Sequence, residues 1–314
     1  MRVVLVANPA ARRVDDAIIE RSADAWSAIG DLTLLHSRGP ATAADLTPLL
    51  TGADAVVVLG GDGILNTVAN AMLDAGSDAV LVPLPGGTTN VAARSLGLPG
   101  RLVDAEPRAR RALLEGRVGP RGVGRLNGRA FVANAGIGFD AAVVARTEAS
   151  PRRKRRFGHS WFAAAAAVEL LRPDGVRRTA LRAEGPGLVG LDGPVFWVVA
   201  MALHPYTYVG RRRIEPVGPG GWRPQDDGLR VLGFAPMATH RLLRLASSAI
   251  LTSRGIDHAA GVFFTQISTD LSISSGDAVK WQIDGEPQPA VARFTLSWHP
   301  AALRVLNPAA APHP

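Results

Sequence analysis

The chain has 314 residues, 47% of them hydrophobic, and it contains no cysteine. This length is sufficient for two compact domains, and the lack of cysteine excludes disulfides, thiolate metal sites and a cysteine nucleophile. The net charge of +8 comes almost entirely from arginine, because Lys154 and Lys280 are the only lysines among the 35 basic residues. The sequence has neither a Cys/His finger nor an aromatic-rich RNA-binding strand, so we expect no nucleic-acid partner.

The first 120 residues alternate between strand and helix patterns. Val3–Ala7 predicts a first strand, and Asn8 and Pro9 begin the loop after it. Apolar residues at helical spacing predict a helix between 14 and 29, and Leu32–Leu35 predicts a second strand. The apolar N-terminal segment is too short for a signal peptide, and no segment reaches the ~18–20 apolar residues that cross a bilayer. We therefore expect a cytoplasmic protein.

Residues 56–70 form the most informative segment. Three valines and a leucine predict a buried strand, which Gly60, Gly61, Asp62 and Gly63 interrupt before a helical pattern begins. A glycine loop at a helix N-terminus suits phosphate, because exposed backbone N–H groups and the helix dipole favour an anion. Asp62 would repel a bare phosphate but would suit a divalent cation held between carboxylate and phosphate. The alternative is an ordinary strand–helix turn.

A second segment repeats this arrangement. Residues 79–84 predict a strand, 85–90 a polar Pro-Gly-Gly-Thr-Thr-Asn loop, and 91–96 a short helix. Two such loops on successive units would lie side by side at the carboxyl edge of a parallel sheet, where open α/β folds bind ligands. Thr88 and Asn90 would bond phosphate oxygens there or cap the helix.

The pattern changes after a helix around Arg108–Leu114 and the turn residues at 119–122. Short β patterns with turn signals between them favour an antiparallel sandwich or barrel. Helical segments near 158–172 and 237–252 interrupt these patterns. The predicted strands are Val123–Leu126, Ala130–Asn134, Val195–Ala200, Leu229–Phe234, Phe263–Ser268, Leu271–Ser274, Ala278–Ile283 and Val291–Trp298.

Two motifs in this second half carry polar residues. Asn134–Asp140 predicts a strand that enters a Gly-x-Gly loop and then a helix, but the third glycine of a dinucleotide fingerprint is absent. Asp284-Gly285-Glu286 follows a predicted strand. It is either a plain β-turn, since Asp-Gly is a common turn pair, or a place where carboxylates take part in proton transfer.

A run of cations, Arg152-Arg153-Lys154-Arg155-Arg156, precedes Trp161. Adjacent cations beside aromatic residues suit the surface of an anionic membrane, where each contributes ~1 kcal/mol. The alternative is a flexible basic loop. The first reading predicts peripheral association with anionic phospholipid.

Four motifs in order resemble those of the diacylglycerol kinase catalytic family, and the resemblance is closest to its bacterial lipid kinases. They are Gly60-Gly61-Asp62-Gly63, the 85–90 loop with Leu96-Gly97-Leu98-Pro99, Asn134–Asp140, and Asp284-Gly285-Glu286. The resemblance implies a three-layer α/β nucleotide-binding domain of the NAD kinase and diacylglycerol kinase type. It also implies a C-terminal β-sandwich domain, with a cleft between the two.

The domain boundaries follow from this layout. Residues 1–121 are predicted to form the α/β domain, completed by 298–309 because family members often return their C-terminal segment to it. Residues 122–297 would form the sandwich, and 310–314 a disordered tail. An exposed edge strand is expected to pair two subunits in a homodimer, as members of the family often do.

The resemblance further implies an ATP-dependent lipid kinase that uses Mg²⁺ and phosphorylates a lipid hydroxyl at a membrane surface, with diacylglycerol as the favoured acceptor. Glu286 would be the general base, Asp62 would face the metal, and Asp284 would complete the catalytic group. The nucleotide-binding residues would be Asn8, Pro9, Gly60, Gly61, Gly63, Asn66, Gly86, Gly87, Thr88, Thr89 and Asn90.

The resemblance gives two further predictions. Gly138 and Asp140 would lie near the substrate. The loop at 224–229 resembles a structural magnesium site of the family, in which Asp227 supplies its side chain and Pro224 and Leu229 supply carbonyl oxygens.

The chain departs from the family at Ile64, where a threonine is usual, and at 10–13, where no glycine follows Asn-Pro. Other lipid alcohols, such as a sphingoid base or a polyprenol, stay open as acceptors. An NAD kinase is an alternative, although Ala135 replaces the acidic residue that normally follows the asparagine there. A non-catalytic lipid- or nucleotide-binding protein is another, which the retention of Asp62 and Glu286 disfavours.

Overall fold

The computed structural model describes residues 1–150, 159–171, 179–185, 193–218, 228–251 and 255–309. The chain divides into two compact units: unit 1 comprises residues 1–122 and 300–314, and unit 2 comprises residues 123–299. The sequence analysis places these divisions at 121/122 and 297/298, and the tail at 310–314 lies outside the described residues. Within the described ranges, every helix is too short or too polar to cross a bilayer.

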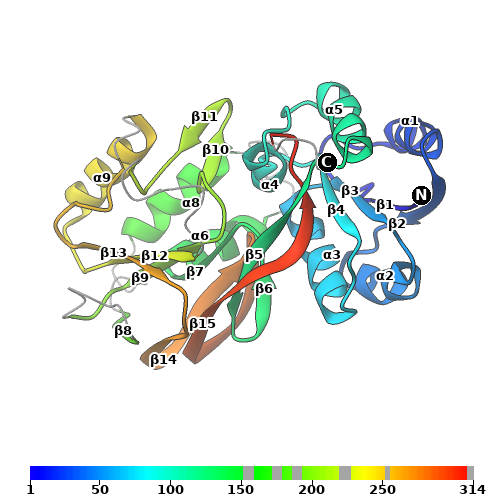
Figure 1. The fold of residues 1–314 in the computed structure, drawn as a ribbon. Coiled ribbons are helices and arrows are strands. Elements are labelled where there is room, and N and C mark those ends of the chain that lie inside the picture. Colours follow the sequence, from blue (N-terminus) through cyan, green and yellow to red (C-terminus); the bar gives the residue numbers. More distant parts are fainter. Residues whose placement is uncertain (151–158, 172–178, 186–192, 219–227, 252–254, 310–314) are drawn as a thin grey trace. The chain divides into compact units, whose positions relative to one another are not determined.

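Unit 1 is built on a parallel sheet with helices on both faces (Figure 1). The strand order is β4-β3-β1-β2, and Val305 of β15 pairs in parallel with Leu81 on the outer side of β4. Helices α1 and α5 pack on one face, and α2 and α3 lie on the other. The elements are β1 (Arg2–Ala7), α1 (Asp16–Ser27), β2 (Asp31–His36), the 3-10 helix η1 (Gly39–Ala41), α2 (Thr42–Leu50), β3 (Ala55–Gly60), α3 (Asp62–Asp74), β4 (Val80–Pro85), α4 (Val91–Ser95) and α5 (Leu102–Leu114).

The apolar runs of the sequence account for this sheet. Every residue of β3 and β4 is buried, as expected for parallel strands that helices cover on both faces. On one face, Trp26 of α1 and Ala109 of α5 join the same core as Leu5 of β1. Helix α1 begins after Asp15, whose side chain accepts the Ile18 N–H at 2.8 Å and so satisfies one of the donors left open at the helix start.

Unit 2 contains an antiparallel series of strands in the order β13-β12-β9-β7-β14-β15. Strand β8 pairs with β14, β5 pairs with β6 and β15, and β10 and β11 form a separate hairpin. The long strands β5 and β15 each continue from one unit into the other. The elements are β5 (Val118–Leu126), β6 (Arg129–Phe131), β7 (Asn134–Gly138), α6 (Phe139–Glu148), α8 (His159–Leu171), β8 (Leu181–Glu184), β9 (Trp197–Met201), β10 (Thr207–Val209), β11 (Arg212–Ile214), β12 (Leu229–Phe234), α9 (Thr239–Leu251), β13 (Val262–Ile267), β14 (Leu271–Ile283) and β15 (Glu286–Leu306).

The structure corrects two strand predictions in unit 2. The predicted strand Ala130–Asn134 is divided, because β6 ends at Phe131 and β7 begins at Asn134. The N–H groups at 132–134 bond the Asp284 carboxylate instead of a neighbouring strand. The two predicted strands at 271–274 and 278–283 are one strand, β14, whose register with β15 shifts between Ser274 and Val279. The glycine and polar residues there mark an irregularity in the strand and not a turn.

Two helices of unit 1 depart from the sequence predictions, and each contains a proline. Helix α2 was not predicted; Pro48 lies inside it, and Thr42, Leu46 and Leu50 are its buried residues. Helix α5 begins at Leu102, earlier than the predicted Arg108, and includes Pro107. Burial of one face outweighs the local preference against proline in both helices.

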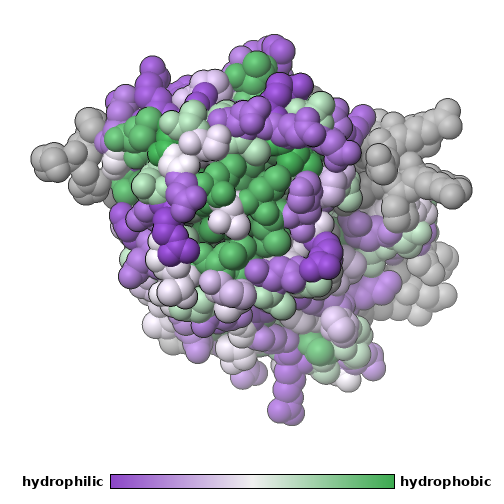
Figure 2. Space-filling view, turned by 90° about the vertical axis from the view of Figure 1, so that its right-hand side faces the viewer, coloured by the Kyte–Doolittle hydropathy of each residue, from purple (hydrophilic) through white to green (hydrophobic). Residues whose placement is uncertain are grey.

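Strand β2 lies at one edge of the unit 1 sheet, since β1 is its only neighbour in the strand order. Figure 2 shows that apolar side chains gather on this side of unit 1 and that polar side chains surround them. Leu34 of β2 is 38% exposed, and Met1, whose carbonyl accepts the Asp31 N–H, is 44% exposed. The expected exposed edge strand is therefore present, and its pairing in a homodimer stays a prediction.

Candidate active site

The unit 1 sheet has a topological switch point between β1 and β3, where successive strands are added on opposite sides. From β1 the chain adds β2 on one side and β3 and then β4 on the other. The loops that leave β1 and β3 therefore diverge from neighbouring strands, which is where open α/β sheets bind ligands. The loop at 8–15 follows β1, and Gly61 directly follows β3.

The two glycine loops touch each other through their backbones. The Gly60 carbonyl accepts hydrogen bonds from the N–H groups of Gly86 at 2.8 Å and Gly87 at 3.1 Å. A Cβ atom on Gly87 would lie 2.7 Å from the Gly61 Cα, and one on Gly86 would lie 2.9 Å from the Gly60 Cα. No side chain fits at these contacts, so the glycines allow the loops to come together. The predicted pairing of the two loops is therefore present in the structure.

Asp62 fastens the second loop to the first. Its Oδ2 accepts the Val91 N–H at 3.0 Å, and its Oδ1 accepts the Ala92 N–H at 3.1 Å. These are the first two residues of α4, so Asp62 caps that helix from the neighbouring loop. Burial raises the pKa of the Asp62 carboxyl above its ordinary value, and the two N–H bonds oppose this shift. The structure thus gives Asp62 a cap contact that the sequence did not reveal, and its predicted contact with a metal stays a prediction.

Asn90 closes the second loop on itself. Its Oδ1 accepts the Gly87 N–H at 2.7 Å, and its Nδ2 donates to the Gly87 carbonyl at 3.0 Å. The residue is buried and has a left-handed backbone, with φ of 52°, which asparagine tolerates better than most residues. Thr88 and Thr89 are partly exposed at the tip of this loop. Asn90 therefore shapes the loop, and the predicted contact of Thr88 and Thr89 with nucleotide stays a prediction.

The loop after β1 joins the same edge of the sheet. The Asn8 side chain accepts the Ala10 N–H at 3.0 Å, and the Arg13 N–H donates to the Gly86 carbonyl at 3.1 Å. The Arg13 guanidinium also donates to the Gly100 carbonyl at 3.1 Å, although the residue is exposed. Pro9 is exposed beside Asn8. The loop contacts the second glycine loop without containing a glycine of its own between 10 and 13.

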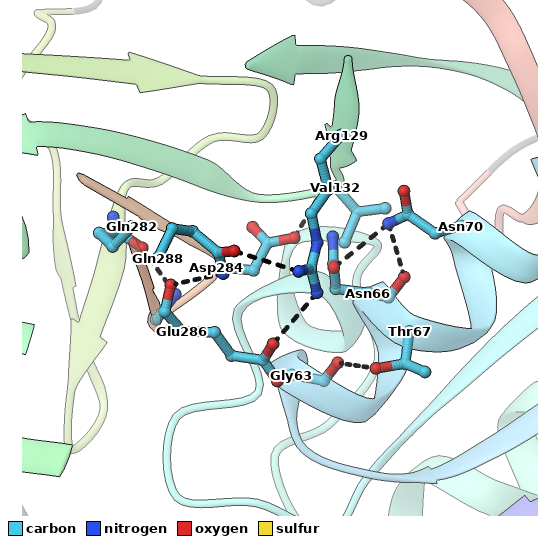
Figure 3. A network of polar contacts seen from close by, with 11 residues as sticks. Gly63, Asn66, Thr67, Asn70, Arg129, Val132, Gln282, Asp284, Glu286 and Gln288 are labelled. Atoms are coloured by element: carbon cyan, nitrogen blue, oxygen red, sulfur yellow. Dashed lines mark hydrogen bonds and ion pairs between the residues drawn. The ribbon is translucent and has the colours of Figure 1, made fainter. Parts of the chain in front are cut away.

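The N-terminus of α3 is the most suitable anion site among these loops. Gly61 stands at its N-cap position and has no side chain to bond the first N–H groups of the helix. Gly63 lies in the first turn, where its carbonyl accepts the Thr67 hydroxyl at 3.3 Å (Figure 3). Backbone donors and the helix dipole together favour a phosphate at such a helix end.

Two residues of α3 that the sequence analysis singled out are buried. Ile64 is 6% exposed, and its Cγ2 would lie 2.4 Å from a Cβ placed on Gly60. The residue that replaces the usual threonine therefore packs under the first loop. Asn66 is 1% exposed and accepts a hydrogen bond from Asn70 Nδ2 at 3.2 Å (Figure 3). Its burial favours a role in holding α3, and its predicted contact with nucleotide stays a prediction.

In unit 2, Asp284 organises the turn between β14 and β15. Its Oδ1 accepts the N–H groups of Ala133 at 2.9 Å and Asn134 at 2.8 Å, and its Oδ2 accepts the Val132 N–H at 2.8 Å. The backbone of the turn is left-handed, with φ of 46° at Asp284 and 84° at Gly285. A carboxylate bound by three N–H groups is held firmly, because hydrogen bonds to a charged acceptor are strong. Asp284 is therefore a structural anchor of the turn that carries Glu286.

A buried polar network joins this turn to Asp140. Gln282 Nε2 donates to Asp140 Oδ2 at 2.6 Å and to Asn134 Oδ1 at 3.2 Å, and Gln282 Oε1 accepts the Gly285 N–H at 2.8 Å. The Tyr206 hydroxyl donates to Asp140 Oδ1 at 2.8 Å. Burial raises the pKa of the Asp140 carboxyl, and burial with the nearby Asp140 charge raises the pKa of Tyr206 well above its ordinary value. The structure thus brings Asp140 and the Asp284 turn, predicted separately, into one network.

The glycines of the 134–140 motif make room for Asp140. A Cβ atom on Gly136 would lie 2.0 Å from Asp140 Oδ2. Gly138 precedes α6 with φ of 86°, a backbone that favours glycine. This Gly-x-Gly sequence therefore shapes the start of α6 around the Asp140 carboxylate.

Glu286, the predicted general base, lies at the start of β15 with 44% of its side chain exposed. Its Oε2 is 3.4 Å from Arg129 Nη2, and Arg129 Nη1 donates to Gln288 Oε1 at 3.2 Å (Figure 3). The carboxylate is thus both held by a cation and open to a substrate. Sequence reasoning did not identify Arg129, Gln282 or Tyr206 as partners of the predicted carboxylates, because their contacts cross large separations along the chain.

Several predicted residues lie outside the described residues. They are Pro224 and Asp227 of the predicted magnesium loop and the cations Arg152, Arg153, Lys154, Arg155 and Arg156. Leu229 is the buried first residue of β12, and Trp161 is partly buried near the start of α8. Within the described residues, no group of three or more His, Asp or Glu side chains is arranged to hold a metal ion.

Comparison with known proteins agrees with this arrangement. Residues 2–126 match the model of the diacylglycerol kinase catalytic domain. A probable lipid kinase YegS-like protein of Pseudomonas aeruginosa is 39% identical over 99 residues, which is 32% of this chain and 31% of that protein. A relative of the same name from Pseudomonas putida is 28% identical over 303 residues and 92% of each chain. A diacylglycerol kinase of Bacillus subtilis is 34% identical over 100 residues, 32% of each chain.

Solved structures share the fold over nearly the whole chain. The crystal structure of a diacylglycerol kinase from Bacillus anthracis aligns with a TM-score of 0.68 and 16% identity, covering 98% of this chain and 96% of its own. An NAD kinase from Archaeoglobus fulgidus, solved with ATP, aligns with a TM-score of 0.52 and 11% identity, covering 98% and 94%. The predicted fold class, an α/β domain followed by a β-rich domain, is confirmed.

The fold is the one that these diacylglycerol kinase and NAD kinase structures share. Over residues 2–126 the chain resembles the diacylglycerol kinase catalytic domain, and the relatives reported above are named as lipid kinases and a diacylglycerol kinase. The predicted resemblance is therefore confirmed.

Proposed function

We propose that the chain transfers the γ-phosphate of ATP to the hydroxyl of a lipid, with diacylglycerol as the acceptor and phosphatidic acid as the product. The observation that carries the proposal is the contact between the two glycine loops in unit 1. Gly60, Gly86 and Gly87 bring together the backbones that follow β3 and β4, at the carboxyl edge of the sheet next to the switch point between β1 and β3. The N-terminus of α3, which has no side-chain cap, lies beside this contact. Backbone donors held rigidly in this way suit a phosphate chain.

In the proposed reaction, unit 1 holds the phosphate donor. The N–H groups at Gly61 and Gly63 would face phosphate oxygens, and the partly exposed Thr88 and Thr89 would add hydroxyl donors. Asp62 would maintain the spacing of the two loops through its bonds to α4. Phosphoryl transfer depends mostly on positioning and charge stabilisation, so a rigid arrangement of donors is a direct contribution to rate.

Unit 2 would supply the base. Glu286 is ionisable, partly exposed and held by Arg129, and its carboxylate would accept the proton of the lipid hydroxyl as that oxygen attacks the γ-phosphorus. Asp284 and Gln282 would fix the turn that carries it. The leaving group is ADP, and the proton passes from the lipid hydroxyl to Glu286. When bound, Mg²⁺ would offset the negative charge of the phosphates.

The test is transfer of labelled γ-phosphate from ATP with Mg²⁺ to a panel of diacylglycerol, monoacylglycerol, sphingosine, ceramide and polyprenol, with NAD in a parallel reaction. We expect labelled phosphatidic acid from the wild-type chain and none from Glu286→Gln. Glu184→Gln is the matched control, because Glu184 is an exposed carboxylate in another strand of unit 2, and it should retain activity. Phosphorylated NAD, or equal activity of Glu286→Gln and wild type, would overturn the proposal.

A further inference from the structure

Where the structure describes its side chains, the outward face of helix α8 (His159–Leu171) is apolar. Its exposed residues are Ala164, Ala167, Val168 and Leu171, which follow the i, i+3, i+4, i+7 spacing of a single helix stripe. Val168 is 45% exposed and Leu171 is 73% exposed. A surface helix normally presents polar residues on this side, so the stripe is adapted to a surface other than water. We call these four residues the α8 stripe.

The only acidic residue of α8, Glu169, lies on the opposite, inward face of the helix. Glu169 is 5% exposed at its side chain, and Arg146 of α6 donates to it at 2.6 Å. Ala165 is buried in the core of unit 2, and Leu170 packs against that core. The helix is therefore seated by its inner face, and its single negative charge is turned inward and neutralised. The α8 stripe is left without charge.

Trp161 lies on the same side of the helix as the stripe. It stands three residues before Ala164 and seven before Val168, a spacing that places all three on one face. It is partly buried. Its indole nitrogen is buried, so Trp161 borders the stripe without forming part of its exposed surface.

The charge of the surrounding sequence indicates which kind of partner surface the apolar stripe would contact. Between residues 152 and 172 the chain has six basic residues and one acidic residue, Glu169. The basic residues are Arg152, Arg153, Lys154, Arg155, Arg156 and Arg172. All six lie outside the described residues, and their charge is known from the sequence. An apolar stripe in a strongly cationic segment is complementary to a bilayer that contains anionic lipid. A nucleic acid would match the charge but not the apolar stripe.

We propose that the α8 stripe inserts into the surface of an anionic bilayer and docks unit 2 there. Helix α8 has 13 residues, which is shorter than the ~20 needed to span a bilayer, so it would lie in the plane of the interface. This inference deepens the proposed function, since a kinase whose acceptor is a lipid must meet the surface that contains it. It assigns docking to residues that take no part in the proposed chemistry.

The test is flotation of the full chain with vesicles of phosphatidylglycerol and phosphatidylcholine, compared with vesicles of phosphatidylcholine alone. The variant is Val168→Asp with Leu171→Asp. The matched control is Val103→Asp with Leu114→Asp, which changes two exposed apolar residues of α5 that are 65% and 62% exposed. We expect the α8 variant to bind anionic vesicles about tenfold more weakly, because two charges replace the inserted side chains, while the control binds as wild type does.

Three outcomes would overturn the proposal. They are undiminished binding by the α8 variant, an equal loss in the control, and equal binding of the wild type to both kinds of vesicle. A change of oligomeric state in the α8 variant, with vesicle binding intact, would assign the stripe to a second copy of the chain. Leu171→Asp alone, at the most exposed position, repeats the test if the double variant unfolds more easily.

Vesicle binding is measured without ATP or acceptor, so the docking result does not depend on kinase activity. A chain that binds through α8 but transfers no phosphate would contradict only the proposed function. A chain that is an active kinase but whose α8 variant binds normally would contradict only the docking proposal. In addition, the α8 variant should retain activity on a short-chain diacylglycerol dissolved as monomers and lose it on diacylglycerol in vesicles.

Discussion

Gln282 donates a hydrogen bond from Nε2 to the Asp140 carboxylate at 2.6 Å. Through its Oε1 the same side chain accepts the Gly285 N–H at 2.8 Å. One amide therefore connects a buried acid at the start of α6 with the turn that precedes Glu286. Changes to this network should therefore alter the turn that carries Glu286. In unit 1, the hydrogen bonds of Asp62 to Val91 and Ala92 join two loops in a similar way.

Replacing Gln282 with leucine should loosen the turn. The substitution keeps most of the volume but removes the partners of Asp140 and Gly285, and unsatisfied buried polar groups cost about 1–3 kcal/mol each. We expect a lower free energy of unfolding, a lower kcat and an unchanged KM for ATP, since the loops proposed to bind ATP are in unit 1. Denaturant unfolding and steady-state kinetics measure these quantities. Gln266→Leu, an exposed glutamine of β13, is the control, and an equal loss there would contradict the prediction.

Replacing Gly136 with alanine should displace Asp140. The added Cβ would lie 2.0 Å from Asp140 Oδ2, so the carboxylate has to move away from Gln282 and Tyr206. Overpacking of this kind costs about 1–3 kcal/mol. Gly276→Ala is the matched control in unit 2, because its Cβ would meet no atom within 4 Å. Thermal unfolding of both variants measures the difference, and equal midpoints would show that the site relaxes without cost.

Replacing Asp62 with asparagine should weaken the cap of α4. Asparagine keeps one acceptor for Val91 or Ala92 and turns an N–H₂ group toward the other donor, and the loss of a cap costs about 0.5–2 kcal/mol. We expect lower stability together with lower activity. Asp74→Asn, exposed at the other end of α3, is the control. Full stability with lost activity would instead support the predicted contact of Asp62 with a metal.

The stability of the chain should depend on the ionisation of Asp140 in acid. Burial raises the pKa of this carboxyl in the folded state above its ordinary 3.8, so the folded state binds more protons than the unfolded state between the two values. The stabilising contribution is complete below the unfolded pKa and is lost as the pH rises through the folded pKa. The free energy of unfolding of the wild type, minus that of Asp140→Asn, should therefore fall as the pH rises from 3.8. Titration of Asp62 is common to both proteins and cancels, and a difference that rises with pH would contradict the prediction.

Sequence patterns were sufficient for the strands and for several helices of unit 1. Uninterrupted apolar runs identify β3 and β4, because parallel strands covered on both faces contain few polar residues. Glycines mark where β3 and β4 end. Helix α2 was missed because Pro48 opposes a helix locally, and only the burial of Leu46 and Leu50 against the rest of unit 1 offsets this preference.

For the candidate site, too, some features could be predicted from the sequence and others could not. The sequence by itself was enough to predict which residues would meet phosphate and accept a proton, since glycine loops and the Asp-Gly-Glu turn are local motifs with local chemistry. Only the tertiary structure decided what each carboxylate does. Asp62 bonds residues 29 and 30 positions away, and Asp284 bonds residues more than 150 positions earlier. No local pattern records such contacts, because the hydrogen-bond partner of a buried carboxylate is set by which strands and helices pack beside it.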